Sequence, residues 1–485
     1  MAHRCGPRIA CLVVWLLAGS ARAGDFMDVR LTWALSDANL LAGDDRSPGL
    51  GILDASDDGA RAFFDNYETK YTGFETLGHL VLYKQIFSFF DYFSADAALF
   101  VRLQTWSFQD EGSYIRIFYD WSHGRSDFKT ISLTLFPLSA DRFRLGYSYR
   151  ISWAGTGIFP EAEFAPGARL RFDHPWGYIF AGFKTARVIE HQEDSEATAL
   201  VMNHGALAGA GLDIEGFAAE IGGGYFSRGT FSHEGVRGRD FHAVGLSYQL
   251  GYHTGCAIGR SLDFELYRND PYLEQHFFAP ETYDGGLSWR IHHEGSVLWQ
   301  PLEDPDNPGA LTTQMAYAFD LNFALKLGFL RLYADALLCS VSYLLFEGPT
   351  YQDFPDSSQR SPEIWAAIGA DYYFEGPRLT PGIKLGLCMP ATVEYESEFG
   401  SRTVVYQDSV YGTILPEGEG ALPIFTLKSS LRWDFAEELA FVAELYYSHD
   451  DNQVEYVSDF YGLNIYSRFA DPHVLGFNLL AQARY

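Results

Sequence analysis

The chain has 485 residues, with 35 Lys and Arg against 63 Asp and Glu, which gives a formal net charge of -28. Because nucleic acids are bound through a basic surface, this charge argues against a nucleic-acid partner. Hydrophobic residues make up 47% of the sequence and aromatic residues 16%, so the chain as a whole can bury a large surface and is not intrinsically disordered.

The first 23 residues have the pattern of a secretory signal peptide. Two arginines precede an apolar stretch over 9–17, and a small-x-small cleavage site follows at 21–23. The apolar stretch is too short to span a membrane as a helix, although a short N-terminal anchor helix is the alternative. We therefore expect 1–23 to be removed and 24–485 to form one domain.

Downstream of the signal peptide, apolar and polar residues alternate with a period of two. The alternation is unbroken over 142–153, 244–253 and 315–327, so each of these stretches has one apolar and one polar face. Strict alternation over such lengths indicates β-strands, and no long amphipathic helix pattern stands out. Similar runs predict further strands at 97–105, 114–122, 129–135, 262–266, 382–389, 425–435 and 439–447.

The length of these runs separates two kinds of sheet. Strands of soluble proteins average about 5–6 residues, whereas a tilted strand needs roughly 9–11 residues to cross a bilayer. Many of the runs have the longer length, which is typical of transmembrane β-barrels. Lipid offers no hydrogen bonds to an open sheet edge, so we expect an all-β, closed antiparallel transmembrane barrel.

The connections between the predicted strands are of two kinds. Tight turns are expected at Gly328, Glu375-Gly376-Pro377 and Ala436-Glu437, and long polar loops at about 345–362, 391–421 and 450–472. This alternation is typical of outer-membrane barrels, in which short turns face the periplasm and longer loops are extracellular. We expect about 18 strands, within a range of 16–20 that reflects the ambiguous stretches 284–301 and 391–421.

The last predicted strand, HVLGFNLLAQARY at 473–485, places Phe477, Leu479 and Tyr485 on one face together with two alanines. It resembles the C-terminal signal of bacterial outer-membrane β-barrel proteins, which end in an aromatic residue preceded by alternating apolar residues. The resemblance implies location in the bacterial outer membrane and recognition by the barrel-assembly machinery. The alanine pair is smaller than the usual residues, and an ordinary edge strand that ends in Tyr is the alternative.

Two further segments are similar to barrels of myxobacterial envelope machines. They read GDFMDVRLTWALSDANLL at 24–41 and FPLSADRFRLGYSYRISWAG at 136–155. This resemblance implies a role in polysaccharide export or in gliding motility.

In a barrel, the polar face of each strand lines the lumen. A cationic strip that favours anionic solutes would be formed by Arg142, Arg144 and Arg150 on one predicted strand and by Arg169 and Arg171 on a nearby one. The alternative is that charges of both signs pair across neighbouring strands. The aromatic residues at the ends of predicted strands are expected at the membrane interfaces, and these are Trp153, Trp433, Phe435 and Tyr485.

The search for catalytic chemistry finds little. The sequence has no G-x-S-x-G elbow and no H-E-x-x-H motif, and the glycine-rich stretch 205–211 falls in a predicted strand rather than in a phosphate-binding loop. The odd number and wide spacing of Cys256, Cys339 and Cys388 indicate no disulfide framework, and the sequence does not choose a single bridge. We therefore expect no catalytic residues, no cofactor and no metal. An enzyme whose active site lies on the barrel wall is a further hypothesis.

Two functions follow from these expectations. The first is a water-filled pore or translocation conduit for hydrophilic solutes or for an exported polymer such as polysaccharide. The second is a structural or docking barrel of an envelope-spanning complex, for example of motility machinery, without free conductance and with periplasmic or lipoprotein partners. Contacts with outer-membrane lipid and lipopolysaccharide are expected of either.

Overall fold

The structure is a computed structural model, and it describes residues 28–37, 39–41, 49–50, 79–104, 107–110, 112–122, 129–146, 151–159, 164–192, 197–255, 283, 285–346, 348, 352–397, 400–406, 412–436, 438–458 and 465–484. Several sequence predictions lie outside these residues, namely the signal peptide at 1–23, the strand at 262–266, Arg150, Cys256 and Tyr485.

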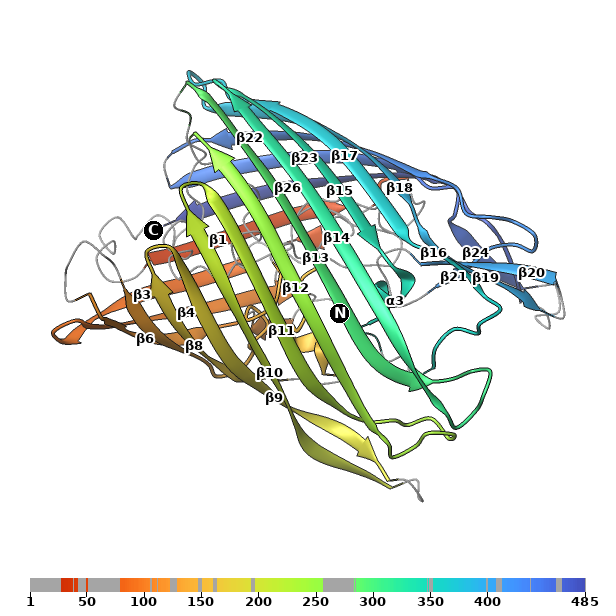
Figure 1. Cartoon of the computed structure of the whole chain (residues 1–485). Coiled ribbons are helices and arrows are strands. Elements are labelled where there is room, and N and C mark those ends of the chain that lie inside the picture. Colours follow the sequence, from red (N-terminus) through yellow and green to blue (C-terminus); the bar gives the residue numbers. More distant parts are fainter. Residues whose placement is uncertain are drawn as a thin grey trace, which may run out of the picture.

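The fold is all-β and is dominated by one sheet of 20 strands whose neighbours run antiparallel (Figure 1). Its strands are β1 (Asp28–Asp37), β2 (Gly49–Leu50), β3 (His79–Phe90), β4 (Phe93–Gln104), β5 (Ser107–Asp110), β6 (Tyr114–Asp120), β7 (Thr130–Phe136), β8 (Gly167–His174), β9 (Gly177–His191), β10 (Thr198–Ile214), β11 (Phe217–Thr230), β12 (Asp240–Thr254), β13 (Leu287–Glu303), β14 (Leu311–Leu327), β15 (Leu330–Cys339), β17 (Glu363–Tyr372), β18 (Leu379–Met389), β22 (Ile424–Asp434), β23 (Leu439–His449) and β26 (His473–Arg484).

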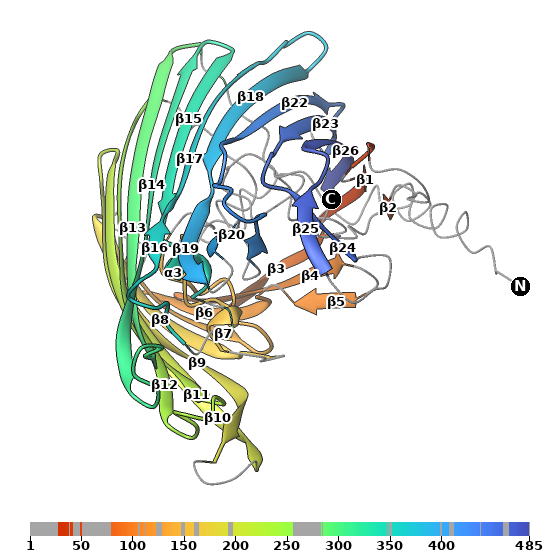
Figure 2. The same ribbon diagram turned by 90° about the vertical axis from the view of Figure 1, so that its right-hand side faces the viewer.

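The long strands pair in chain order, so that each one lies beside the next. The first strand, β1, pairs with β3 on one side and with the last strand, β26, on the other. Leu31, for example, lies opposite Leu80 of β3 and Ala483 of β26. The sheet is therefore a curved wall around an interior, which Figure 2 shows from the side.

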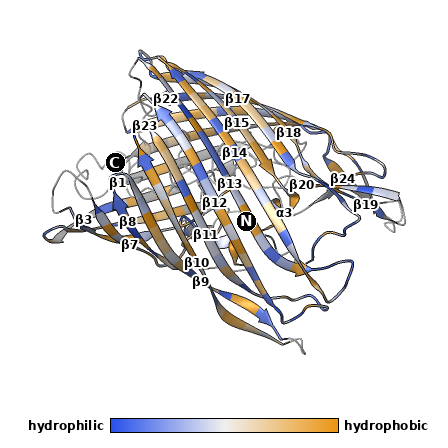
Figure 3. Ribbon diagram, viewed as in Figure 1, coloured by the Kyte–Doolittle hydropathy of each residue, from blue (hydrophilic) through white to orange (hydrophobic). Residues whose placement is uncertain are grey.

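The wall has an apolar outward face and a polar inward face, which is the reverse of a water-soluble protein. On β9, Phe183 is 54% exposed, whereas the next residue, Lys184, is fully buried. On β14, Leu321 is exposed and the preceding Asp320 is buried. Figure 3 shows this alternation along the strands. An outward apolar face around a charged interior is the arrangement of a transmembrane β-barrel wall.

Most of the predicted strands and turns are confirmed. The runs at 97–105, 114–122, 129–135, 244–253, 315–327, 382–389, 425–435 and 439–447 correspond to β4, β6, β7, β12, β14, β18, β22 and β23. Gly328 forms the tight turn between β14 and β15 with a φ of 57°, a left-handed conformation that suits glycine. Of the ambiguous stretch at 284–301, residues 287–301 belong to the single long strand β13.

The long polar loops contain strands of their own outside the wall. The connections at 345–362 and 391–421 contribute β16 (Gln359–Ser361), β19 (Ala391–Ser397), β20 (Gly400–Tyr406) and β21 (Thr413–Ile414) to a separate four-stranded sheet. The connection at 450–472 contains the pair β24 (Val454–Ser458) and β25 (Ile465–Phe469). Of the described helices, none is long and apolar enough to span a membrane.

The strand predicted at 142–153 is wrong. The described residues of this stretch form turns and one isolated antiparallel bridge, between Leu145 and Trp153. Residues of both parities are buried, as Phe143, Arg144 and Leu145 are. Apolar and polar residues alternate here without forming a strand, because side chains of both parities are buried against protein and no face of the segment meets lipid.

Candidate functional site

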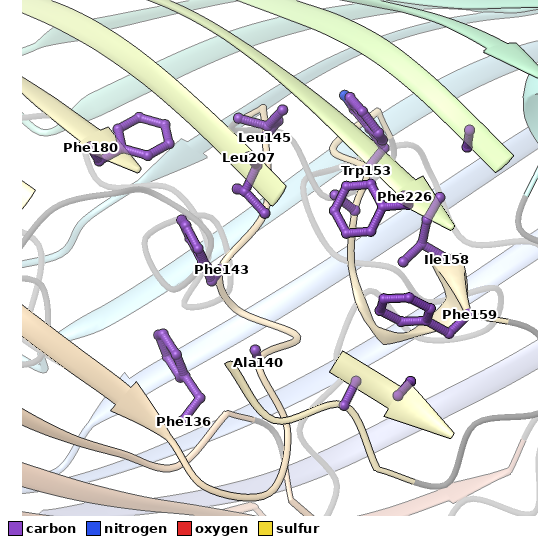
Figure 4. Close-up of a cluster of buried hydrophobic side chains, with 14 of the residues drawn as sticks. Phe136, Ala140, Phe143, Leu145, Trp153, Ile158, Phe159, Phe180, Leu207 and Phe226 are labelled. Atoms are coloured by element: carbon purple, nitrogen blue, oxygen red, sulfur yellow. The ribbon is translucent and has the colours of Figure 1, made fainter. Parts of the chain in front are cut away.

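Two segments fold into the interior of the wall. The first inner loop connects β7 to β8 (residues 137–166) and includes the 3-10 turn η1 (Thr156–Ile158), and the second inner loop (340–346) follows β15 and includes the helix α3 (Val341–Leu344). The first inner loop contributes much of a buried apolar cluster that also contains side chains of the wall, as Figure 4 shows. The hydroxyl of Tyr343 donates to the carbonyl of Ile151, which joins the two loops.

The first inner loop reverses direction at Gly146. The φ of this residue is 99°, and a Cβ atom there would lie 2.9 Å from the Cα of Ser152. Glycine therefore permits both the left-handed backbone and the close approach of the returning chain. The reversal places Leu145 beside Trp153, so that both side chains face the same part of the wall.

Glycines on the inward face of β9, β11 and β12 make room for this loop. A Cβ at Gly182 would lie 2.4 Å from the Phe143 ring, one at Gly222 would lie 2.6 Å from Leu145, and one at Gly245 would lie 2.5 Å from the Trp153 ring. We call Gly182, Gly222 and Gly245 the glycine seat. The glycine-rich sequence of this part of the chain thus provides packing space for side chains rather than a phosphate cradle.

Aromatic rings fill the space between the loop and the wall. Phe143 stacks on Phe136 of β7 with ring centroids 6.1 Å apart. Trp153 and Phe159 both contact Phe226 of β11, at 5.9 and 5.7 Å (Figure 4). Edge and stacked contacts of this kind add to the free energy gained from burial alone.

Hydrogen bonds fix the loop at several points. The indole Nε1 of Trp153 donates to Ser247 Oγ at 2.7 Å, and Ser296 Oγ donates to the carbonyl of Ile151 at 2.9 Å. The ammonium group of Lys184 donates to the carbonyl of Ala154. Because these groups are buried, losing one partner would leave the other unsatisfied at a cost in stability.

Arg228 of β11 holds both inner loops. Its Nε donates to the carbonyl of Ile158 at 2.8 Å, and its Nη1 donates to the carbonyl of Phe346 at 2.9 Å and to Gln300 Oε1 at 2.7 Å. The guanidinium carbon also lies 4.6 Å from the ring centroid of Phe241. One buried side chain of the wall therefore connects two loops that are far apart in the sequence.

Two of the predicted lumen-lining residues, Arg142 and Arg144, lie on the first inner loop instead of on a wall strand. The Arg142 guanidinium lies over the Phe100 ring at 4.2 Å. Arg144 donates from Nη1 to Ser152 Oγ at 3.3 Å and approaches Asp141 at 3.9 Å. Both side chains are buried within the interior, so their packing contributes to the position of the loop.

The other two described candidates, Arg169 and Arg171, lie on the inward face of β8. The Arg169 guanidinium lies 5.5 Å from the centroid of the Phe143 ring, and that of Arg171 lies 3.7 Å from the centroid of the Tyr178 ring. Arg171 also donates from Nε to Asp173 Oδ1 at 2.7 Å. The structure thus brings Arg169 to the first inner loop and gives Arg171 a carboxylate partner.

The inward face of the later strands carries paired charges. Lys384 lies 3.1 Å from Asp335, and Lys428 lies 3.2 Å from Glu444, in each case on a nearby strand. Asn478 of β26 donates to Glu444 at 3.1 Å. The Lys428–Glu444 pair joins the adjacent strands β22 and β23 and agrees with the alternative interpretation of the sequence, whereas Lys384 and Asp335 pair across the intervening strand β17.

The expected aromatic positions are only partly as predicted. Trp433 and Phe435 are exposed at the end of β22, in accord with an interfacial position. The prediction that Trp153 lies at a membrane interface is wrong, because its side chain is buried in the interior. On β26, Leu479 is exposed on the outward face and Phe477 shares that face, while their role as an assembly signal stays a prediction.

Sequence reasoning missed Arg228, Gln300 and Tyr343. The alternation of the sequence could have placed Arg228 on the inward face, since it lies two residues after Phe226 on β11. In the described part of the chain, Cys339 and Cys388 are buried, and no group of three or more His, Cys, Asp or Glu residues could hold a metal ion.

No protein-family model and no curated protein matches the chain. Among solved structures, the chain is similar to OpdQ of Pseudomonas aeruginosa (9% identity, 95% of this chain and 97% of that chain covered, TM-score 0.44). It is also similar to an anion-selective porin from Comamonas acidovorans (10%, 95% and 98%, TM-score 0.36) and to the outer membrane channel DcaP of Acinetobacter baumannii (9%, 95% and 95%, TM-score 0.36). We infer no shared function from likeness at this level.

Proposed function

We propose that the chain is an integral β-barrel of the bacterial outer membrane that forms a water-filled pore for hydrophilic solutes. The observation that carries the proposal is the inverted wall, with exposed apolar side chains outside and buried charges inside. Such a wall is stable where its outward face meets acyl chains and its inward face meets water.

The pairing pattern supports a closed barrel of 18 strands. Of the 20 strands in the sheet, β2 and β5 pair with one neighbour each, and the remaining 18 pair on both sides, including β1 with β26. A sheet without free edges leaves no backbone group unpaired in lipid. The proposed orientation places the end of the wall with the Gly328 turn in the periplasm, together with the β12–β13 connection (255–286), and the other long connections outside.

In this orientation both inner loops enter from the extracellular end, because each connects strands opposite to the short turns. They reduce the passage, and the basic residues Arg142 and Arg144 of the first inner loop lie near Arg169 of the wall. We propose that the pore favours small anionic solutes. Export of a polymer such as polysaccharide stays a prediction from the sequence.

A docking barrel is the second candidate function, and the filled interior favours it. The first and second inner loops share one buried cluster with the wall, in which Phe159 and Phe346 are almost fully buried. A barrel obstructed in this way would act through its extracellular loops or periplasmic turns, with lipoprotein or periplasmic partners.

Conductance measurements separate the candidates. The processed chain would be extracted from the envelope in detergent, tested for heat-modifiable mobility and inserted into planar lipid bilayers. A pore gives stepwise conductance with anion preference in a salt gradient. A heat-modifiable protein without conductance would support the docking barrel, and recovery from the water-soluble fraction would refute both.

A further inference from the structure

Three of four neighbouring strands carry a basic side chain on the outward face, where the wall is mostly apolar. Arg187 of β9 and His204 of β10 are exposed, and His242 of β12 is partly exposed. Figure 1 shows β9, β10, β11 and β12 side by side. We call Arg187, His204 and His242 the outward basic group.

The register of the sheet brings this group together. His204 lies opposite Thr185 of β9, and His242 lies opposite Ser227 of β11. Because Gly205 pairs with Phe226, the preceding His204 lies alongside Ser227. The hydroxyl of Ser227 donates to the buried Asn203, so the outward basic group consists of His204 with Arg187, two residues beyond Thr185 on the same face, and of His242 across β11.

Charge is rare elsewhere on this face. Among outward positions whose exposure the structure describes, and away from strand ends, Lys, Arg, Asp and Glu are found at Arg187 and at Lys84 of β3. The outward carboxylate on the same four strands is Asp240, the first residue of β12. Since the cost of a cation on a lipid-facing surface falls steeply towards the interface, the group is expected near headgroups rather than at the bilayer centre.

The surroundings of the group fit a lipid headgroup. Met202 lies opposite Arg187, and the exposed side chains of Phe183, Leu200 and Tyr225 lie on the same face of these strands. The His242 ring stacks on Tyr225 with centroids 5.7 Å apart, which restrains its orientation. Cationic and N–H donors beside exposed apolar side chains match a molecule that has a phosphate next to acyl chains.

We propose that Arg187, His204 and His242 bind the phosphate groups of a phosphorylated glycolipid of the lipid A type in the outer leaflet. The arginine fork and the imidazole N–H groups donate to phosphate oxygens. The group lies towards the end of the wall opposite the Gly328 turn, so its leaflet follows from the orientation given under the proposed function, on which this inference rests. The chain as a whole has a net charge of -28, so a cationic patch is the part of its surface that attracts a lipid phosphate.

The test uses the full processed chain in detergent and purified lipid A, with and without its phosphates. We compare the wild type, the triple variant R187Q/H204Q/H242Q and the control K84Q, which removes an outward charge on a different strand. Retention of lipid is measured by native mass spectrometry after detergent exchange. We expect the wild type and K84Q to retain phosphorylated lipid A at least tenfold better than the triple variant, and to show no such preference for the dephosphorylated lipid.

Equal retention by the triple variant and the wild type would overturn the inference, provided that both show the same heat-modifiable mobility. It would also be overturned if the wild type formed oligomers that the triple variant does not form, with lipid retention unchanged, because the group would then be an interface between copies. Conductance is read in parallel. The group lies outside the wall, so lipid retention without conductance would refute the pore and leave this inference intact.

Discussion

The inward faces of two parts of the wall, β9–β13 and β15–β23, are filled in different ways. On β9–β13 the inward face is rich in glycine and accepts the first inner loop through aromatic contacts and hydrogen bonds to backbone carbonyls. On β15–β23 the inward face carries longer charged side chains that pair with one another, as Lys384 does with Asp335. The comparison teaches that one alternating pattern supports either a wall that receives a loop or a wall whose polar side chains satisfy each other.

Of the substitutions considered, Trp153→Ala should lower the unfolding free energy most strongly, because Trp153 anchors the first inner loop to β9–β13. The substitution removes a buried ring from the interior and the donor to Ser247, and we expect a loss of about 3–5 kcal/mol in unfolding free energy. Denaturant unfolding in detergent measures this loss. Trp433→Ala is the matched control, because Trp433 is 42% exposed on the outward face and should change stability far less. Equal losses would contradict the packing described here.

Arg228→Met should release both inner loops at once. The carbonyls of Ile158 and Phe346 would lose their donor, and we expect a cost of about 2–3 kcal/mol together with larger and noisier conductance. Single-channel recordings test the effect on the passage. Arg432→Met serves as control, since Arg432 is partly exposed and contacts Asp434 on its own strand. Unchanged conductance in Arg228→Met would argue against a role of the loops in the passage.

Lys428→Met tests the charge-paired side. The substitution leaves Glu444 buried without its cation, and we expect a loss of about 1–2 kcal/mol, less than for a pair in a dry core because the proposed lumen is wet. The double variant with Glu444→Gln should recover much of that loss. A double-mutant cycle of unfolding free energies measures the coupling, and the absence of coupling would contradict direct pairing.

The smallest expected effect comes from Gly222→Ala in the glycine seat. The added Cβ would meet the end of the Leu145 side chain at 2.6 Å, which can shift, so we expect a cost of about 1 kcal/mol. Gly376→Ala is the control, because a Cβ there meets nothing within 4 Å. Thermal unfolding in detergent compares the two variants, and a larger effect at Gly376 would be unexpected on this geometry.

The wall was largely predictable from the sequence, whereas the interior was not. Long alternating runs identify strands such as β14 and β22 because one of their faces must be apolar throughout. The same rule failed at 142–153, where the alternating residues form turns and an isolated bridge and are buried inside the wall at both parities. The partners of Arg142 and Arg144 depend on where that segment folds, and Arg228 gains its role from two loops distant in sequence.

The pairing of β1 with β26 has a consequence for biogenesis. Asn39, just after β1, accepts a hydrogen bond from Leu475 of β26, a residue 436 positions away, whereas the other wall strands meet partners that follow closely in the chain. Contacts between remote segments form slowly, because the ends of a long chain must first find each other. Almost the entire polypeptide must be synthesised before β1 can pair with β26. Until then the edges of β1 and β23 lack a partner strand and must be protected from pairing with other chains.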